Sequence, residues 1–188
     1  LRENVDEKKI YITGNTVIDA LKSTVKDDYK FTDETLANLD FSSKKVILVT
    51  AHRRENLGEP LRNICEALRH IVTTYKDVHL VYPVHLNPAV REVANEILGG
   101  LDRVSLIEPV NVDDLHNAMA RCYMVMTDSG GLQEEAPSLA KPVIVLRNET
   151  ERPEAVEAGT VKVAGVKKDD IIALASELIE NKDAYDKM

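Results

Sequence analysis

The chain has 188 residues, 44 % of them hydrophobic, so it suits one domain with a core of its own. With 24 Lys and Arg residues against 32 Asp and Glu residues, its formal net charge is −8. This charge argues against general binding of nucleic acid or of anionic membranes.

The chain also shows no sign of membrane insertion or secretion. No apolar run approaches the roughly 20 residues of a membrane span, and the charged opening LRENVDEKK is unlike a signal peptide. Cys65 and Cys122 lie far apart inside apolar patterns, so we expect buried thiols without a disulfide, in the reducing cytoplasm. The chain begins at Leu1 instead of Met, a first indication that it belongs to something longer.

Short β-branched runs alternate with longer amphipathic segments. Residues 44–50 (KKVILVT) form a continuous apolar run, which predicts a strand buried on both faces. Asn15 is a candidate N-cap of the first helix. Predicted strands cover residues 8–13, 44–50, 78–84, 103–109, 123–127, 142–146 and 160–165. Predicted helices cover residues 15–25, 59–75, 88–98, 112–122, 130–139, 152–159 and 168–181.

This alternation predicts an α/β domain with a Rossmann-like, doubly wound parallel sheet and helices on both faces. No interdomain linker interrupts it, so residues 1–188 are expected to form a single domain. Ligands of such sheets bind at the carboxyl ends of the strands, and the turns that follow the strands are therefore the candidate functional segments.

Two of these turns carry histidine. In TAHRRENLGEP (residues 50–60), His52 and Arg53 belong to a local positive patch, which is either a binding loop or a solvated loop with an Arg–Glu pair. His85 stands at a strand end between two prolines, and a ligand contact or hydrogen bonds to loop carbonyls fit it equally. The other histidines lie within predicted helices or at the start of a strand and are expected to be structural: His70, His79 and His116.

A third turn, in MTDSGGLQEEAPSLAKP (residues 126–142), combines glycines with acids. Ser129, Gly130 and Gly131 form a strand-to-helix turn, where free N–H groups suit a phosphate. Ser129 can cap the helix or donate its hydroxyl to the anion. Glu135 lies about one turn after Gly131 and can reach back to ribose hydroxyls; alternatively, Glu134 and Glu135 only complement the helix dipole. The turn matches neither the Walker nor the GxGxxG pattern.

The next turn adds arginines in RNETERPEAVEAGT (residues 147–160). Arg152 precedes a predicted helix and can clamp a diphosphate, whereas either Arg147 or Arg152 can also pair with nearby Glu149, Glu151 or Glu154. Together the four turns predict a nucleoside-diphosphate site.

The motifs ITGNTVIDAL, TAHRREN, VYPVHLNPAVRE, MTDSGGLQEEAPSLAKPV and RNETERPEAVEAGT occur in the order seen in bacterial non-hydrolysing UDP-N-acetylglucosamine 2-epimerases, and the chain resembles this family over almost its whole length. The family is similar to two-domain glycosyltransferases of the glycosyltransferase-B-like fold. The resemblance implies that the chain is the C-terminal, UDP-binding half and that the N-terminal catalytic domain is absent from it.

The resemblance also implies a reaction. UDP-N-acetylglucosamine and UDP-N-acetylmannosamine interconvert by elimination and re-addition of UDP through 2-acetamidoglucal, without a cofactor or a metal. The expected partners are UDP-N-acetylglucosamine, UDP, the missing N-terminal domain and, in the complete enzyme, a second identical subunit. The expected setting is cytoplasmic synthesis of cell-envelope polysaccharide, and this half alone is expected to be inactive.

Carried over by motif, His52 matches the catalytic histidine, and Arg53 and His85 match positions that bind a second UDP-N-acetylglucosamine as an allosteric activator. The implied UDP-binding residues are Ser129, Gly130, Gly131, Glu135 and Arg152. Val110 and Leu115 stand where family members often carry glutamine and phenylalanine near the uracil, so base recognition is expected to differ. Two alternatives remain: the donor-binding half of a UDP-sugar glycosyltransferase, and a stand-alone nucleotide-sugar binding module.

Overall fold

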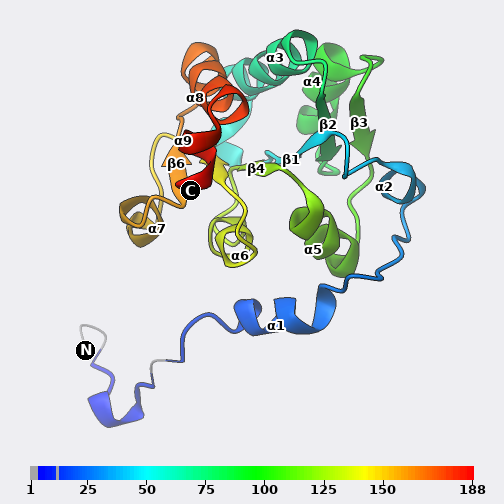
Figure 1. Ribbon diagram of the computed structural model, residues 1–188. Coiled ribbons are helices and arrows are strands. Elements are labelled where there is room, and N and C mark those ends of the chain that lie inside the picture. Colours follow the sequence, from blue (N-terminus) through cyan, green and yellow to red (C-terminus); the bar gives the residue numbers. More distant parts are fainter. Residues whose placement is uncertain (1–3, 12) are drawn as a thin grey trace.

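A computed structural model describes residues 4–11 and 13–188 and contains one parallel sheet with the strand order β3-β2-β1-β4-β5-β6 (Figure 1). The strands are β1 (Lys45–Thr50), β2 (Val78–Pro83), β3 (Val104–Ile107), β4 (Met124–Thr127), β5 (Val143–Val145) and β6 (Val161–Val163). Every neighbouring pair is parallel, which confirms the predicted Rossmann-like, doubly wound fold.

Helices cover both faces of the sheet. One face carries α3 (Glu59–Thr74), α4 (Pro88–Leu98), α8 (Lys168–Glu180) and α9 (Lys182–Asp186). The other carries α1 (Thr16–Thr24), α2 (Glu34–Asn38), α5 (Val112–Arg121), α6 (Leu132–Ser138) and α7 (Pro153–Glu157). Successive side chains of β1 point to opposite cores: Val46 and Leu48 pack with the second group, Ile47 and Val49 with the first. The predicted two-sided burial of this strand is confirmed.

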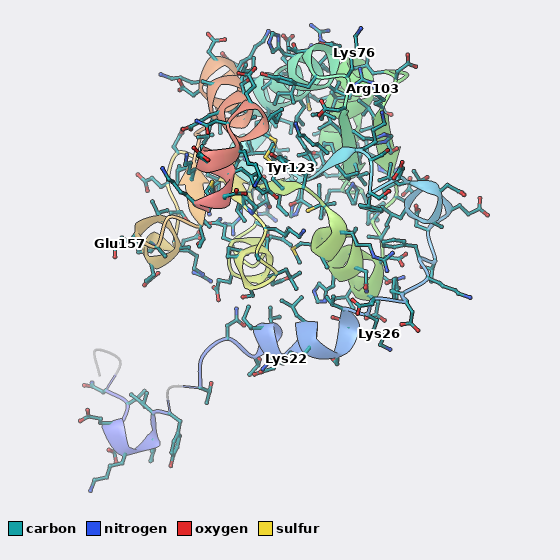
Figure 2. The ribbon with its side chains drawn as sticks, in the orientation of Figure 1. Lys22, Lys26, Lys76, Arg103, Tyr123 and Glu157 are labelled. Atoms are coloured by element: carbon teal, nitrogen blue, oxygen red, sulfur yellow. The ribbon has the colours of Figure 1, made fainter. Side chains whose placement is uncertain are left out.

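Side chains fill the space between the sheet and each helix layer, whereas Lys22 on α1 and Glu157 on α7 project outward (Figure 2). The predicted strands and helices from residue 15 onward are present, with Asn15 capping α1 through Val17 N at 3.1 Å. The short helices α2 and α9 were not predicted, because five residues are too few to establish a helical period.

The predicted strand at residues 8–13 is wrong. Glu7–Lys9 form a 3-10 helix that Asp6 caps, and residues 10, 11 and 13 are not in a strand; residue 12 lies outside the described residues. A strand needs a neighbour to pair with, and this segment lies away from the sheet (Figure 1).

The strand order places a topological switch between β1 and β4. The chain leaves β1 toward α3 on one face and leaves β4 toward α6 on the other, so the two loops diverge at the place where sheets of this kind bind ligands. The last residues of these strands are in register, and the buried hydroxyls of Thr50 and Thr127 lie 2.6 Å apart. The two strands are therefore fixed relative to each other directly below the switch point.

Asp114 on α5 attaches the segment between α1 and α2 to the domain. Its buried carboxylate accepts hydrogen bonds from Tyr29 Oη (2.8 Å), Thr32 N (2.9 Å), Thr32 Oγ1 (2.6 Å) and Asp33 N (3.0 Å). Burial alone would raise the pKa of Asp114, but the hydrogen bonds from Thr32, Tyr29 and Asp33 together lower it below the usual value. The charged form is the one that the fold stabilises.

Replacing Asp114 by alanine should lower the free energy of unfolding at pH 7 by about 3 kcal/mol, because Tyr29, Thr32 and Asp33 lose a buried, charged acceptor. Since the folded pKa is depressed, this contribution is complete above the unfolded pKa, at about 4, and is lost as the pH falls through the folded pKa. Urea unfolding at pH 7 and pH 3 measures both effects. Asp113→Ala, an exposed neighbour on α5, is the control; equal losses from both variants would contradict the assignment.

Candidate functional site

Asp128, directly after β4, holds the loop after β1. Its side chain is fully buried, and Oδ2 accepts hydrogen bonds from His52 N (2.8 Å), Arg53 N (2.8 Å) and Asn56 Nδ2 (3.0 Å). Its other oxygen, Oδ1, is buried and meets no hydrogen-bond partner within the described part of the chain. One carboxylate thus joins the loop after β1 to the loop after β4.

The rings of His52 and His85 stack on each other. Their centroids are 4.9 Å apart and their planes differ by 21°, although the residues follow different strands, β1 and β2. His85 Nδ1 accepts a hydrogen bond from Asn87 N at 3.1 Å, so the neutral ring carries its proton on Nε2. The structure therefore brings together two of the predicted site residues, and both are exposed.

The turn between β4 and α6 needs glycine because a side chain would be crowded there, and not because of an unusual φ angle. Neither Gly130 nor Gly131 has a positive φ. A Cβ on Gly131 would lie 3.1 Å from Glu135 Oε1, and a Cβ on Gly130 would lie 3.3 Å from Glu151 Oε2. Glu135 thus reaches back to the turn, as its spacing predicted. Ser129 does not cap α6, because the cap position is Gly131 and no side chain caps it.

Gln133, which the sequence did not single out, ties the glycine turn to the loop after β5. The side chain is fully buried; its Nε2 donates to Ser129 O at 3.1 Å and its Oε1 accepts from Thr150 Oγ1. The sequence contained a signal for Gln133: it is a polar residue close to the glycines, on a helix face that is otherwise apolar. Asp128 had a similar signal, because it is a charged residue directly after an apolar strand.

The arginines of the site are all paired with glutamates. Arg53 Nη1 lies 3.4 Å from Glu151 Oε1, and Arg147 Nη1 lies 3.0 Å from Glu151 Oε2. Arg147 Nε also lies 2.6 Å from Glu55 Oε1, and the hydrogen bond to Glu151 raises the pKa of Arg147. This outcome for Arg147 is one of the two that the sequence left open.

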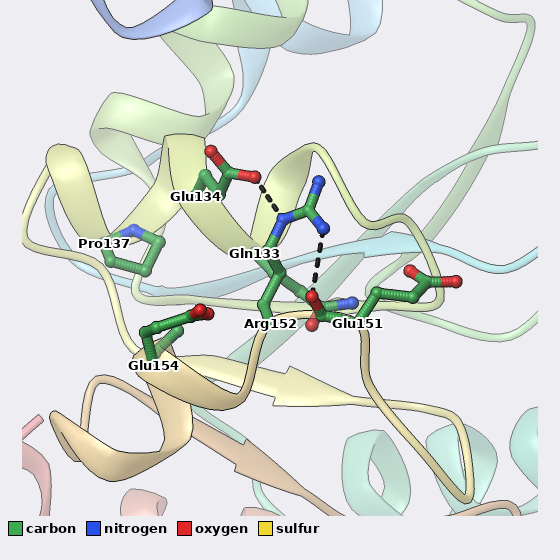
Figure 3. Close-up of a pocket in the computed structure, with 7 residues that line it drawn as sticks. Gln133, Glu134, Pro137, Glu151, Arg152 and Glu154 are labelled. Atoms are coloured by element: carbon green, nitrogen blue, oxygen red, sulfur yellow. Dashed lines mark hydrogen bonds and ion pairs between the residues drawn. The ribbon is translucent and has the colours of Figure 1, made fainter. Parts of the chain in front are cut away.

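Arg152 has a partner that the sequence did not suggest. Its Nε donates to Glu134 on α6, and its Nη1 donates to Glu151 O at 3.1 Å (Figure 3). Asn15 Nδ2 holds the other oxygen of Glu134 at 2.6 Å, and the hydrogen bonds from Asn15 and Arg152 lower the pKa of Glu134. The guanidinium of Arg152 is therefore already bound by a carboxylate and a carbonyl oxygen in this structure.

A pocket of about 510 Å³ opens between α6 and α7 around this ion pair (Figure 3). Its lining consists of Gln133, Glu134, Pro137, Glu151, Arg152, Glu154 and Ala155. Of the predicted UDP-binding residues it contains Arg152 alone; Ser129, Gly130, Gly131 and Glu135 lie at the neighbouring turn.

Metal ligands, membrane spans and cysteines are the next features of the described residues. No group of three or more His, Cys, Asp or Glu residues there is placed to hold a metal ion, and none of the helices described is long and apolar enough to cross a membrane. Cys65 and Cys122 are buried free thiols, and burial raises the pKa of each to about 12, so both are unreactive at neutral pH.

The remaining histidines divide between the surface and the interior. His70 is exposed on α3, and His79 Nε2 lies 2.9 Å from Ser105 Oγ across the β2–β3 pair. His116 is buried and contacts Glu135, so it adjoins the candidate site.

The fold and the loops at its carboxyl edge define the class: a Rossmann-type α/β domain with a glycine turn, a carboxylate and arginines after its central strands. Residues 1–188 match the family model described as UDP-N-acetylglucosamine 2-epimerase, and the chain belongs to this family.

Known relatives agree with this assignment. A putative UDP-N-acetylglucosamine 2-epimerase of Thermotoga maritima is 58 % identical over 188 residues, which are 100 % of this chain and 50 % of the relative. The chain spans about half the length of the curated relatives it matches.

Solved structures give the same result. The S. aureus MnaA–UDP structure is 51 % identical with a TM-score of 0.90, and the match covers 100 % of this chain and 50 % of that one. The Neisseria meningitidis UDP-GlcNAc 2-epimerase bound to UDP-GlcNAc is 43 % identical with a TM-score of 0.89, covering 100 % and 52 %. At 14 % identity, an E. coli heptosyltransferase (TM-score 0.54, covering 77 % and 46 %) shares the fold, which is that of one half of a glycosyltransferase-B-like protein.

Asp128→Ala should lower the free energy of unfolding by about 3 kcal/mol, because it removes the shared acceptor of two backbone N–H groups and one amide in a buried place. Asp128→Asn should cost less, since its amide oxygen can replace Oδ2 as the acceptor. Urea unfolding gives both values. Asparagine and alanine variants of equal stability would show that the clamp at Oδ2 is not what stabilises the loop.

Proposed function

We propose that the chain is the C-terminal, UDP-binding domain of a cytoplasmic UDP-N-acetylglucosamine 2-epimerase. The observation that carries this proposal is the family match over all 188 residues, combined with a chain that spans half of its relatives. Relatives whose solved structures contain UDP or UDP-GlcNAc support the nucleotide-sugar as ligand. An N-terminal domain supplies the rest of the active site, and the complete enzyme is a homodimer.

In this proposal the diphosphate lies at Ser129, Gly130 and Gly131. Arg53 Nη2, which lies 3.5 Å from the place of a Cβ on Gly130, supports this placement, and Glu151 Oε2, at 3.3 Å from the same place, has to move away. Glu135 accepts hydrogen bonds from the ribose hydroxyls. Arg152 leaves Glu134 and binds a phosphate, to which a guanidinium can donate two hydrogen bonds at once.

The proposed reaction is an elimination followed by an addition. A base from the N-terminal domain removes the proton at C2, the bond from C1 to the UDP oxygen breaks, and the electron pair of the C2–H bond forms the double bond of 2-acetamidoglucal. UDP then adds back to C1 while C2 receives a proton on the opposite face. Negative charge develops on departing UDP, so donors fixed at the diphosphate lower the barrier. His52 acts at the diphosphate, from the beginning of the loop that Asp128 holds.

Arg53 and His85 form a second, allosteric site for UDP-N-acetylglucosamine in this proposal. The stack of His52 on His85 supports a direct contact between that site and the catalytic histidine. A UDP-sugar glycosyltransferase would use the same half-fold; activity of the complete enzyme on UDP-N-acetylglucosamine without any acceptor distinguishes the two.

Calorimetric titration of UDP and of inorganic diphosphate should separate the roles of Glu135 and Arg152. Glu135→Ala should weaken UDP binding about tenfold and leave diphosphate binding unchanged, because only UDP offers ribose hydroxyls. Arg152→Ala should weaken both ligands. Glu92→Ala, an exposed position on α4, is the matched control. Equal losses of UDP and diphosphate in Glu135→Ala would exclude the ribose assignment.

His52→Ala in the complete enzyme should lower turnover at least a hundredfold, while UDP affinity changes by less than about fivefold, because the side chain acts on developing charge. Steady-state epimerisation and UDP titration measure the two quantities. His70→Ala, an exposed histidine on α3, serves as control. Near-normal turnover in His52→Ala would refute a catalytic role.

A further inference from the structure

His116 is a buried histidine that the proposed reaction does not use. It lies on α5 with 3 % of its surface exposed, between α1 and α6. Its Nδ1 is 2.8 Å from Thr24 Oγ1, and its Nε2 is 3.4 Å from Glu135 Oε2. The ring therefore bridges the end of α1 and the carboxylate that adjoins the glycine turn.

The number of protons and acceptors around Thr24 decides which nitrogen of His116 donates and which accepts. The hydroxyl of Thr24 has one proton and two acceptors within reach, His116 Nδ1 at 2.8 Å and Ala20 O at 3.1 Å. If the hydroxyl donates to Nδ1, the neutral ring carries its proton on Nε2. If it donates to Ala20 O instead, Nδ1–H donates to Thr24 and the neutral ring aims its Nε2 lone pair at a carboxylate, which is unfavourable. The favourable tautomer therefore has Nε2–H on the side of Glu135.

The two oxygens of Glu135 consequently have different surroundings. Oε2 faces His116 in the interior, whereas Oε1 lies at the glycine turn, 3.1 Å from the place of a Cβ on Gly131. Neighbouring hydrogen bonds hold the end of α1 against α5: Asn117 Oδ1 accepts from Lys26 N at 3.0 Å, and Asn117 Nδ2 donates to Thr24 O at 2.8 Å. A carboxylate held at one oxygen keeps the other in a constant position for a ligand.

We propose that His116 is a positioning residue, which binds Glu135 through Oε2 and so presents Oε1 to the ribose hydroxyls of a nucleoside diphosphate at the glycine turn. This inference rests on the proposed function, since it concerns the same carboxylate. It adds α1 to the site, because Thr24 orients the ring through Nδ1.

Two amide substitutions separate the two ring nitrogens. In His116→Asn the side-chain amide takes the place of Nδ1 and cannot reach Glu135, whereas in His116→Gln it takes the place of Nε2 and can donate to it. In the complete gene product, calorimetry with UDP and inorganic diphosphate should give about tenfold weaker UDP binding for His116→Asn, near-normal UDP binding for His116→Gln and unchanged diphosphate binding for both.

The same substitution in a Glu135→Ala background tests whether His116 acts through Glu135: His116→Asn should then cause no further loss of UDP affinity. Thr24→Val, which removes the hydroxyl at nearly constant volume, should weaken UDP binding by a smaller factor, about threefold. If thermal unfolding shows that the His116→Asn variant is unfolded, Thr24→Val takes its place in the test. Equal effects of the asparagine and glutamine variants, or a further loss in the Glu135→Ala background, would overturn the positioning role.

Failure of the proposed function has a different signature. If the unsubstituted protein does not bind UDP, or if Glu135→Ala leaves its affinity unchanged, the ribose assignment is wrong and the role of His116 falls with it. If Glu135→Ala weakens UDP and His116→Asn does not, the nucleotide site stands and only the positioning role is refuted.

Discussion

The hydrogen bonds of Asp128 are the constraint on which the candidate site depends. A single carboxylate oxygen accepts the backbone N–H groups of His52 and Arg53 and the amide of Asn56, so the loop after β1 takes its shape from a residue after β4. Asn56 also donates to Leu146 O at 3.0 Å, so the residue directly after β5 is joined to the same loop. Three loops at the carboxyl edge are thereby fixed relative to one another, and the glycine turn lies among them.

Charge at this edge is balanced before any ligand binds. Arg53 and Arg147 share Glu151, Arg147 also pairs with Glu55, and Arg152 pairs with Glu134. Under the proposed function, an incoming diphosphate has to replace carboxylates as the partner of these guanidinium groups, and the displaced carboxylates must find water or other donors. Such an exchange costs affinity but favours ligands with two phosphates over single anions, because several pairs have to be replaced together.

The sequence predicted the sheet and most helices, because residues 44–50 and 59–75 have unambiguous periods and their burial follows directly from them. It failed at residues 8–13, where local β propensity had no neighbouring strand to pair with. Within the site, the reach of Glu135 toward Gly131 followed from helical spacing. The partner of Arg152, the clamp by Asp128 and the contact of His116 with Glu135 join distant segments, and no local pattern encodes such pairings.

The strand order also leads us to expect a particular order of events in folding. Thr50 and Thr127, which meet where β1 and β4 end, are 77 residues apart, so this pairing closes a long loop, whereas β1 and β2 are joined by a shorter segment that contains α3. Loop closure over longer segments costs more conformational entropy and is slower, so we expect the β1–α3–β2 unit to assemble before β4 docks. The edge that carries the glycine turn then forms late. A chain released before β4 is made would leave the edge of β1 that normally pairs with β4 unpaired and accessible to other molecules.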